Sequence, residues 1–175
     1  AAIDGAITGG RTAYHYFRTP ELQVSIKADG TPVTLADKAS ELAILAKLQN
    51  FDAGCGFLSE ETGAQGSTSH RWIIDPLDAT KNFVRGITVW AVLIALEEDG
   101  EVVAGVVHEP ATGNLWTARK RDGAFLNGHP IRVSNIEKLE KALLLHGNVK
   151  TIFLDQKFWP KFAELLPKVS RTRGL

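Results

Sequence analysis

The change in hydrophobic spacing near residue 70 places the strongest constraint on how this chain can fold. Before it, apolar residues recur at helical spacing over 34–48, and a glycine-interrupted segment over 2–17 is also predicted to be a helix. After it, short apolar runs separated by turn residues predict strands over 72–74, 88–96, 101–108, 114–119, 124–126 and 131–133. Helices followed by mostly antiparallel strands predict an α+β fold, with the two N-terminal helices packed on one face of the sheet.

The rest of the chain shows weaker patterns. A short strand is predicted over 22–26, a short helix over 136–141, and a longer helix over 153–166 that Pro160 must begin or kink. The last residues show no closing element. Because no linker or shift in composition interrupts the sequence, we expect a single domain over residues 1–175.

Composition argues against several classes of partner. Lys plus Arg and Asp plus Glu number 20 each, so no basic excess favours nucleic acid or a membrane surface. No apolar run approaches the roughly 18 residues that span a bilayer. Cys55 is the single cysteine, which is consistent with a reducing compartment such as the cytoplasm. No histidine lies near it in the sequence, and no histidine pair has zinc-site spacing, so Cys55 is interpreted as a buried or loop thiol.

The most informative motif for chemistry runs from Asp75 to Thr80. An apolar strand leads into two carboxylates three residues apart, with Pro76 fixing the backbone where the strand ends. Hard cations such as Mg²⁺ prefer oxygen ligands, and the side chains of Asp75 and Asp78 with the Leu77 carbonyl can supply them. Thr80 begins a predicted short helix over 80–84, where backbone N–H groups favour an anion. Cations beside an anion site suit a phosphate ester.

Each acidic residue also has a structural interpretation. Asp78 can be an N-cap and Asp75 a turn residue at the strand end. Glu60 and Glu61 form an acidic pair that is common on solvated loops. Thr34 and Asp37 have the spacing of a capping box, and Lys27 lies in a polar turn, where lysines are commonly only solvated.

Three motifs together resemble the inositol monophosphatase superfamily of Mg²⁺-dependent, Li⁺-sensitive phosphatases. They are Thr34-Leu35-Ala36-Asp37, Ser59-Glu60-Glu61 and the specific twelve-residue stretch Trp72-Ile73-Ile74-Asp75-Pro76-Leu77-Asp78-Ala79-Thr80-Lys81-Asn82-Phe83. The stretches 105–110 and 123–128 also fit, so the resemblance covers about residues 5–133 in the family's order. It implies the N-terminal half of a layered αβαβα phosphatase fold, with the family's C-terminal substrate domain absent or incomplete here.

The resemblance also implies a metal site. Glu60, Asp75 and the Leu77 carbonyl would hold a first Mg²⁺, and Asp75 and Asp78 would share a second. Two or three ions in total are implied, with Li⁺ inhibitory.

It further implies that backbone N–H groups of Ala79 and Thr80 bind the phosphate. The Thr80 hydroxyl would position the attacking water, with Asp37 and Glu60 acting in catalysis beside it. Glu61 and Lys27 would lie next to the metal ligands without binding the metal themselves. The family usually has Gly at position 79, and a methyl group there restricts the turn.

The predicted function is therefore Mg²⁺-dependent hydrolysis of a small phosphate monoester by a metal-activated water. The stretch 81–86 followed by Val89-Trp90 favours histidinol phosphate over inositol monophosphate as the substrate, and other small phosphate esters and bisphosphate nucleotides are further alternatives. The resemblance implies a homodimer. One alternative is a catalytically inactive fragment that binds metal and phosphate, because the second domain is missing. Another is a purely structural or interaction domain in which the acids are caps.

Overall fold

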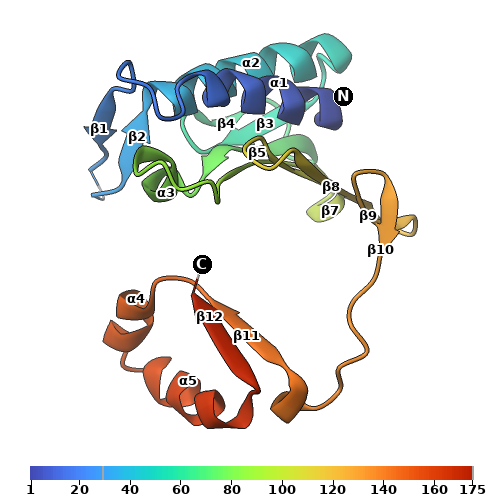
Figure 1. Ribbon diagram of the computed structural model, residues 1–175. Helices are drawn as coiled ribbons and strands as arrows, with labels where there is room; N and C mark the ends of the chain where they lie inside the picture. The colour runs from blue at the N-terminus through green and yellow to red at the C-terminus, as the bar shows by residue number, and fades with distance from the viewer. Residues whose placement is uncertain (29, 175) are drawn as a thin grey trace. The chain divides into compact units, whose positions relative to one another are not determined.

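The computed structural model describes residues 1–28 and 30–174 (Figure 1). Contacts between residues group the chain into two compact units, residues 1–131 and 132–175. The sequence pattern, which suggested one domain over 1–175, carries no sign of this division. Each unit is described by itself below.

The first unit contains three helices and ten strands within its described residues. In chain order they are α1 (Ala2–His15), β1 (Val24–Ile26), β2 (Pro32–Thr34), α2 (Leu35–Phe51), β3 (Gly56–Ser59), β4 (Gly63–Gln65), β5 (His70–Asp78), α3 (Thr80–Val84), β6 (Ala91–Glu98), β7 (Glu101–Glu109), β8 (Asn114–Arg119), β9 (Gly123–Leu126) and β10 (His129–Ile131).

Eight of these strands form one sheet in the order β10-β9-β8-β7-β6-β5-β3-β4. All neighbouring pairs are antiparallel except β3 and β5, which run parallel with Gly56 opposite Arg71 and Ser59 opposite Ile74. Strand β4 lies in a segment where the sequence patterns described above predict no strand. It pairs antiparallel with β3 at the edge of the sheet, and the chain then returns to start β5 beside β3.

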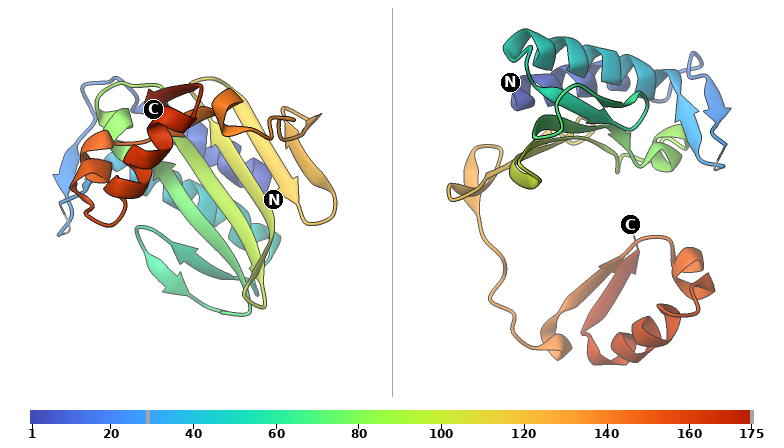
Figure 2. Two further views of the ribbon diagram at one scale, coloured as in Figure 1. Left: turned by 90° about the horizontal axis from the view of Figure 1, so that it is seen from below. Right: turned by 180° about the vertical axis from the view of Figure 1, so that it is seen from behind.

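Helices α1 and α2 cover one face of this sheet, as expected for the α+β fold (Figures 1 and 2). A buried cluster joins the helices to β3, β5, β6 and β7, and its fully buried members include Ala6, Ile44, Leu48 and Val92. Gly9 permits close approach of the helices, because a Cβ there would lie 2.5 Å from the Ile44 side chain. The glycines that weaken the helical pattern of the first segment therefore serve packing.

Helix α2 begins with the capping box that the sequence predicted. The Asp37 carboxylate accepts from the Thr34 backbone N–H at 2.8 Å, and the Thr34 hydroxyl oxygen accepts from Ala36 N–H at 3.1 Å. These bonds satisfy amide groups that the first turn of a helix leaves unpaired. The start of α2 is therefore fixed beside the end of β5.

A second buried cluster lies beneath the end of β5. Phe17, Phe83 and Trp90 pack against one another, with the Phe83 and Trp90 rings edge to face at 4.8 Å between centroids. Leu77, only 1% exposed, belongs to the same cluster. The turn that follows β5 is thereby held against the body of the unit.

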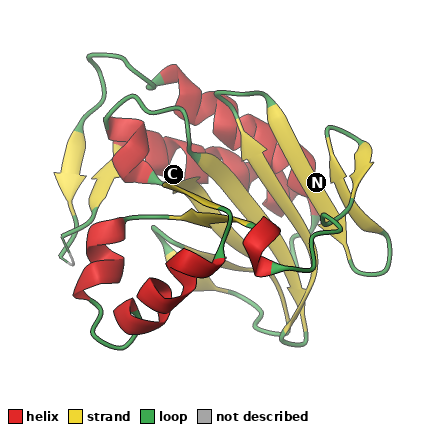
Figure 3. Cartoon of the chain, turned by 60° about the horizontal axis from the view of Figure 1, so that its bottom comes forward, coloured by secondary structure: helices red, strands yellow, loops and turns green. Residues whose placement is uncertain are grey.

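The second unit contains β11 (Leu143–His146) and β12 (Arg171–Gly174), which pair in parallel, and two short helices, α4 (Val149–Leu154) and α5 (Trp159–Leu165) (Figure 3). Two 3₁₀ turns cover Leu139–Lys141 and Leu166–Lys168. Strand β12 corrects the expectation that the last residues show no closing element. Pro160 lies in the first turn of α5, consistent with the prediction that it begins a helix.

No helix among the described residues combines the length and the apolar character needed to cross a membrane.

Candidate functional site

Two of the predicted acidic residues meet because β3 and β5 run parallel. The register puts Ser59 opposite Ile74, and the Glu60 N–H donates to the Ile74 carbonyl at 3.2 Å. Glu60 therefore leaves β3 beside Asp75 of β5. Since the carboxyl ends of parallel strands share one edge of a sheet, residues 15 apart along the chain reach the same place.

The predicted metal and phosphate ligands line one cavity of about 320 Å³. Asp78 and the start of α3 complete the wall that Glu60 and Asp75 begin. The lining residues are Thr31, Pro32, Glu60, Asp75, Leu77, Asp78, Ala79, Thr80 and Lys81. All six residues predicted to hold metal or phosphate are among them, whereas Asp37, Glu61 and Lys27 are not.

Asp75 is the most perturbed acid of this cavity. Burial raises its pKa to about 7, and the negative charges of Glu60 and Asp78 add to the effect. The Leu77 backbone N–H, which donates to Asp75 Oδ1 at 3.1 Å, opposes it only in part. The same bond makes Asp75 a turn residue, so the structural interpretation of this residue is compatible with a chemical one.

Lys27 links the two glutamates. Its ammonium donates to Glu60 Oε1 at 2.8 Å and to Glu61 Oε1 at 2.7 Å. Burial lowers the pKa of Lys27, but its hydrogen bonds to the two carboxylates and their charges outweigh burial and raise the pKa above its ordinary value. Glu61, whose side chain is 10% exposed, is the more enclosed partner. Lys27 thus restrains Glu60 at the mouth of the cavity.

Asp37 connects the start of α2 to the start of α3. Its Oδ2 accepts from the Thr34 hydroxyl at 2.6 Å, and its Oδ1 is 3.1 Å from the Thr80 hydroxyl. The Leu77 carbonyl also lies 3.1 Å from that hydroxyl. Burial raises the Asp37 pKa, while its hydrogen bonds to Thr34 and Thr80 act in the opposite direction. The carboxylate of Asp37 therefore both caps α2 and contacts the site.

Two further polar residues of α2 hold the site in place, and the sequence interpretation missed both. The Ser40 hydroxyl donates to the Pro76 carbonyl at 2.8 Å, and Glu41 Oε1 accepts from the Thr62 hydroxyl at 2.9 Å. Ser40 is fully buried and Glu41 is 2% exposed. The sequence contained a pattern that could have identified these two residues, because they follow Asp37 by three and four positions and so lie on the same face of the helix.

Ala79 sits at a backbone position that ordinarily favours glycine. Its φ is 65° and its ψ is 44°, which is the left-handed region. Ala79 is the residue that precedes α3, and it makes no side-chain capping bond. The N-cap interpretation of Asp78 is therefore wrong, and Asp78 is one of the residues that line the cavity.

The three carboxylates do not form one tight group, although Glu60 and Asp75 approach closely enough for a hydrogen bond between their side chains. Within residues 1–28 and 30–174, one group of three histidine, cysteine or acidic side chains has all its ligand atoms within 4.8 Å of one another, and it lies elsewhere. Glu60 is instead held by Lys27. A cation bound by all three acids would bring their oxygens closer.

Comparison with known proteins agrees with the sequence motifs. The model of the inositol monophosphatase family matches residues 1–168. The chain is 45% identical over 140 residues to an inositol-1-monophosphatase of Mesorhizobium japonicum, covering 78% of this chain and 53% of that protein. It is 40% identical over 136 residues to a histidinol-phosphatase of Chlorobaculum parvum, covering 77% of this chain and 52% of that protein.

Solved structures give the same result. The extragenic suppressor protein suhB of Bartonella henselae superimposes with a TM-score of 0.89 at 34% identity, covering 98% of this chain and 67% of that one. An IMPase of Thermotoga maritima superimposes with a TM-score of 0.85 at 32% identity, covering 99% and 66%.

The match is partial in one respect, since the chain spans about half the length of the curated relatives it matches. Within that span, family model, sequence identity and fold coincide. The chain belongs to the inositol monophosphatase family.

Proposed function

We propose that this chain provides the metal- and phosphate-binding part of a Mg²⁺-dependent hydrolase that acts on a small phosphate monoester. One observation carries the proposal. Glu60, Asp75 and Asp78, which are separated in the sequence, line one cavity together with the Ala79–Thr80 turn. Relatives named as phosphatases support the class of reaction.

The donor set suits a hard divalent cation. Glu60, Asp75, Asp78 and the Leu77 carbonyl would hold Mg²⁺, and all are oxygen ligands. The raised pKa of Asp75 shows that burial and neighbouring charge make its anionic form costly, a cost that a cation would offset. When bound, Mg²⁺ supplies Lewis acidity, which makes water a stronger nucleophile and neutralises negative charge on the ester. The family resemblance implies two or three ions and inhibition by Li⁺.

The chain's own groups have distinct roles in this proposal. Thr80 can donate its one hydroxyl proton to Asp37 or to the Leu77 carbonyl, which leaves its oxygen able to accept from a water and orient it. The backbone N–H groups of Ala79 and Thr80 would bind phosphate oxygens. Lys81 lines the same cavity and adds a positive charge. Asp37 acts as a fixed acceptor that aims the hydroxyl.

Two substrates remain candidates. The relatives include an inositol-1-monophosphatase and a histidinol-phosphatase at similar identities of 45% and 40%. We propose these two ester classes, inositol monophosphate and histidinol phosphate, as the compounds to compare first.

A second candidate function is binding of metal and phosphate without turnover. The observation that favours it is that the named phosphatases are about twice as long as the span they share with this chain. Both proposals predict Mg²⁺ binding, and they differ in whether phosphate is released.

The decisive experiment measures phosphate release from both esters by this chain, with Mg²⁺ and with a chelator. We expect release that requires Mg²⁺ and falls about 100-fold or more in Asp75→Asn, because outer contacts of metal ligands alone contribute up to about 100-fold. Asp122→Asn, an exposed acid far from the cavity in sequence, serves as the control and should match the wild type. Mg²⁺ binding without release would favour the second function, and Mg²⁺ affinity unchanged by Asp75→Asn would contradict both.

We also propose that the protein works in the cytoplasm and forms a homodimer, with a small phosphate ester as its partner molecule. The single cysteine supports the first point, and the family resemblance supports the second.

A further inference from the structure

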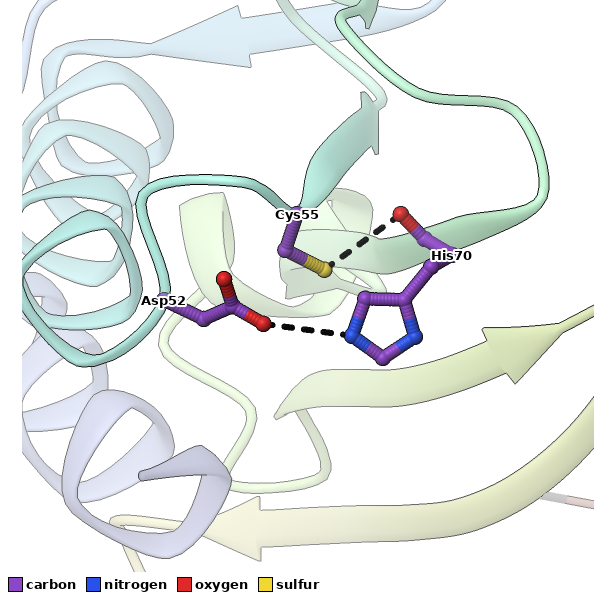
Figure 4. A group of neighbouring side chains, drawn as sticks. All are labelled: Asp52, Cys55 and His70. Carbon is purple, nitrogen blue, oxygen red and sulfur yellow. Dashed lines mark hydrogen bonds and ion pairs between the residues drawn. The ribbon is translucent and has the colours of Figure 1, made fainter.

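Asp52, Cys55 and His70 form a mixed ligand cluster outside the acidic cavity (Figure 4). One ligand atom from each side chain lies within 4.8 Å of the other two. The group combines a sulfur, an imidazole nitrogen and a carboxylate oxygen. This is the donor combination that borderline-soft divalent metals such as Zn²⁺ prefer, and it differs from the all-oxygen set that suits Mg²⁺.

The fold assembles this cluster through the register of β3 and β5. Gly56 lies opposite Arg71, so Cys55, which immediately precedes β3, lies beside His70, the first residue of β5. Asp52 ends α2 and is joined to Cys55 by a tight turn in which the Cys55 N–H donates to the Asp52 carbonyl at 3.3 Å. Three separate elements therefore place one ligand each, although Cys55 and His70 are 15 residues apart.

One of the three distances between ligand atoms is already close to that of a tetrahedral metal site, and the other two are below 4.8 Å. His70 Nε2 lies 3.2 Å from Asp52 Oδ2. Metal–ligand bonds of about 2.0–2.3 Å at tetrahedral angles place ligand atoms about 3.3–3.8 Å apart. Small side-chain rotations would therefore bring all three atoms around one ion, leaving a fourth position for solvent.

Neighbouring groups fix the ligands in the orientation that a metal needs. The Gly54 N–H donates to Asp52 Oδ1 at 3.0 Å, which leaves Oδ2 facing the histidine. Glu98 Oε1 lies 3.7 Å from the other ring nitrogen, His70 Nδ1. A carboxylate behind the non-ligating nitrogen is the usual partner of a metal-bound histidine, because it keeps Nε2 free of a proton.

We propose that Asp52, Cys55 and His70 bind a Zn²⁺-like divalent cation that joins the end of α2 to the start of β5. The side chains of Asp52 and His70 are 38% and 40% exposed, so an ion can enter from solvent, while Cys55 is 5% exposed. Five residues of β5 separate His70 from Asp75, about 16 Å along a strand. The proposed site is therefore distinct from the acidic cavity and independent of its function.

Binding replaces a proton by the metal. In the metal-free protein, burial and the Asp52 charge raise the pKa of the Cys55 thiol. The bound cation takes the thiolate as ligand, and the thiol proton passes to solvent. The Cys55 thiol donates to the His70 carbonyl at 3.5 Å, and metal binding would replace this bond. The hydrogen bond from the Trp72 backbone favours the thiolate and opposes the effects of burial and of Asp52 in part.

The competing interpretation is a simple ion pair between His70 and Asp52 beside an inert buried thiol. Co²⁺ distinguishes the two, because a thiolate bound to Co²⁺ gives a charge-transfer absorption in the near ultraviolet. Cys55 is the single cysteine of the chain, so such a band reports this site and no other.

The experiment titrates the full 175-residue chain with Co²⁺ without phosphate and with a reductant that contains no thiol, and then adds Zn²⁺. We expect a band that saturates with one ion per chain and disappears when Zn²⁺ displaces Co²⁺. It should be absent in Cys55→Ala, and Co²⁺ affinity should fall at least about tenfold in Asp52→Asn and in His70→Gln. Both of these residues are partly exposed, so the variants test the site even if Cys55→Ala does not fold.

Two controls separate this site from the acidic cavity. The double variant Glu60→Gln with Asp78→Asn should keep the full band, as should His129→Gln, which alters an exposed histidine. A folded wild-type chain that shows no band at large excess of Co²⁺ would overturn the proposal. So would a band that keeps wild-type affinity in His70→Gln or in Asp52→Asn.

Discussion

At the scale of single residues, the site contains an alanine in a conformation that suits glycine. Ala79 has a φ of 65° at the turn between β5 and α3, and the chain accepts it because Leu77 and Phe83 on either side are buried. The position explains why the resemblance led us to expect glycine there. It also makes a stability test possible at the centre of the candidate site.

We expect Ala79→Gly to raise the free energy of unfolding by about 0.5–1 kcal/mol. Relief of roughly 1–2 kcal/mol of left-handed strain outweighs the roughly 0.5–1 kcal/mol of conformational entropy that glycine loses on folding. Chemical denaturation measures the change. Ala46→Gly, on the exposed side of α2, is the matched control and should lose about 1 kcal/mol. Equal losses in both variants would refute the strain argument.

His108 supplies a second test at this scale. It is 9% exposed, and its Nδ1 donates to the Ala6 carbonyl of α1 at 3.1 Å. Burial lowers the pKa of His108, and the positive charge of Arg11 lowers it further. The hydrogen bond to Ala6 acts in the opposite direction. The unfolded chain therefore takes up a proton on His108 before the folded one does, and stability falls as the pH decreases below the ordinary histidine pKa.

The expected result is a free energy of unfolding that decreases more in the wild type than in His108→Asn between about pH 7.5 and about pH 5.5. The amide of Asn can still donate to the Ala6 carbonyl but does not titrate. Denaturant titrations at the two pH values measure the difference. If the pH dependence were the same in both proteins, His108 would not be its source.

At the scale of elements, α2 organises the candidate site. Asp37, Ser40 and Glu41 share one buried face of the helix. Asp37 accepts a hydrogen bond from Thr80, Ser40 donates to the Pro76 carbonyl, and Glu41 accepts from Thr62. The turns that carry Glu60 and Asp75 are thus tied to one helix. Apolar residues at these positions would pack the helix equally well but would not position the loops.

Glu41→Ala tests this role. It leaves the Thr62 N–H and hydroxyl without their buried acceptor, so we expect a loss of about 1–3 kcal/mol in unfolding free energy. Mg²⁺ affinity should also weaken, because the turn with Glu60 loses its anchor. Lys38→Ala removes an exposed side chain of the same helix and should change neither quantity. Calorimetric titration with Mg²⁺ and denaturant unfolding give the two readouts.

At the scale of the whole molecule, the division at residues 131 and 132 separates two units of unequal character. Both buried hydrophobic clusters and the eight-stranded sheet lie within residues 1–131. The second unit has one two-stranded sheet, and Phe162 is its single buried hydrophobic residue among those described. The first unit therefore contains the core that folding requires.

We expect residues 1–131 alone to fold and to unfold in one cooperative transition. Such a chain should keep the Mg²⁺ affinity of the longer one, because every residue of the acidic cavity belongs to it. Circular dichroism during heating and calorimetric titration measure the two properties. A shortened chain that stays unfolded would show that residues 132–175 are needed for the first unit.

Local patterns predicted what depends on local geometry. The Thr34–Asp37 capping box follows from a few adjacent residues, and the strands predicted over 101–108 and 114–119 match β7 and β8. Long-range partners could not be found in this way. Ser40 bonds a carbonyl 36 residues away, and the boundary near residue 131 leaves no mark in composition.

The same contrast between local patterns and long-range contacts applies to the candidate site. The roles of Glu60, Asp75 and Asp78 came from family motifs, and their common cavity is a product of the parallel strand pair. Cys55 and His70 carry no motif, because their proximity exists only once β3 lies beside β5.

The parallel pairing of β3 and β5 limits how the length of this protein can vary. Cys55 and Glu60 lie immediately before and after β3, five residues apart, and His70 and Asp75 lie five residues apart on β5. Inserting or deleting a residue within one strand alone would shift one end out of alignment and turn its side chains to the opposite face. A change of length between the residues of either pair would therefore move apart the ligands at one end of the two strands.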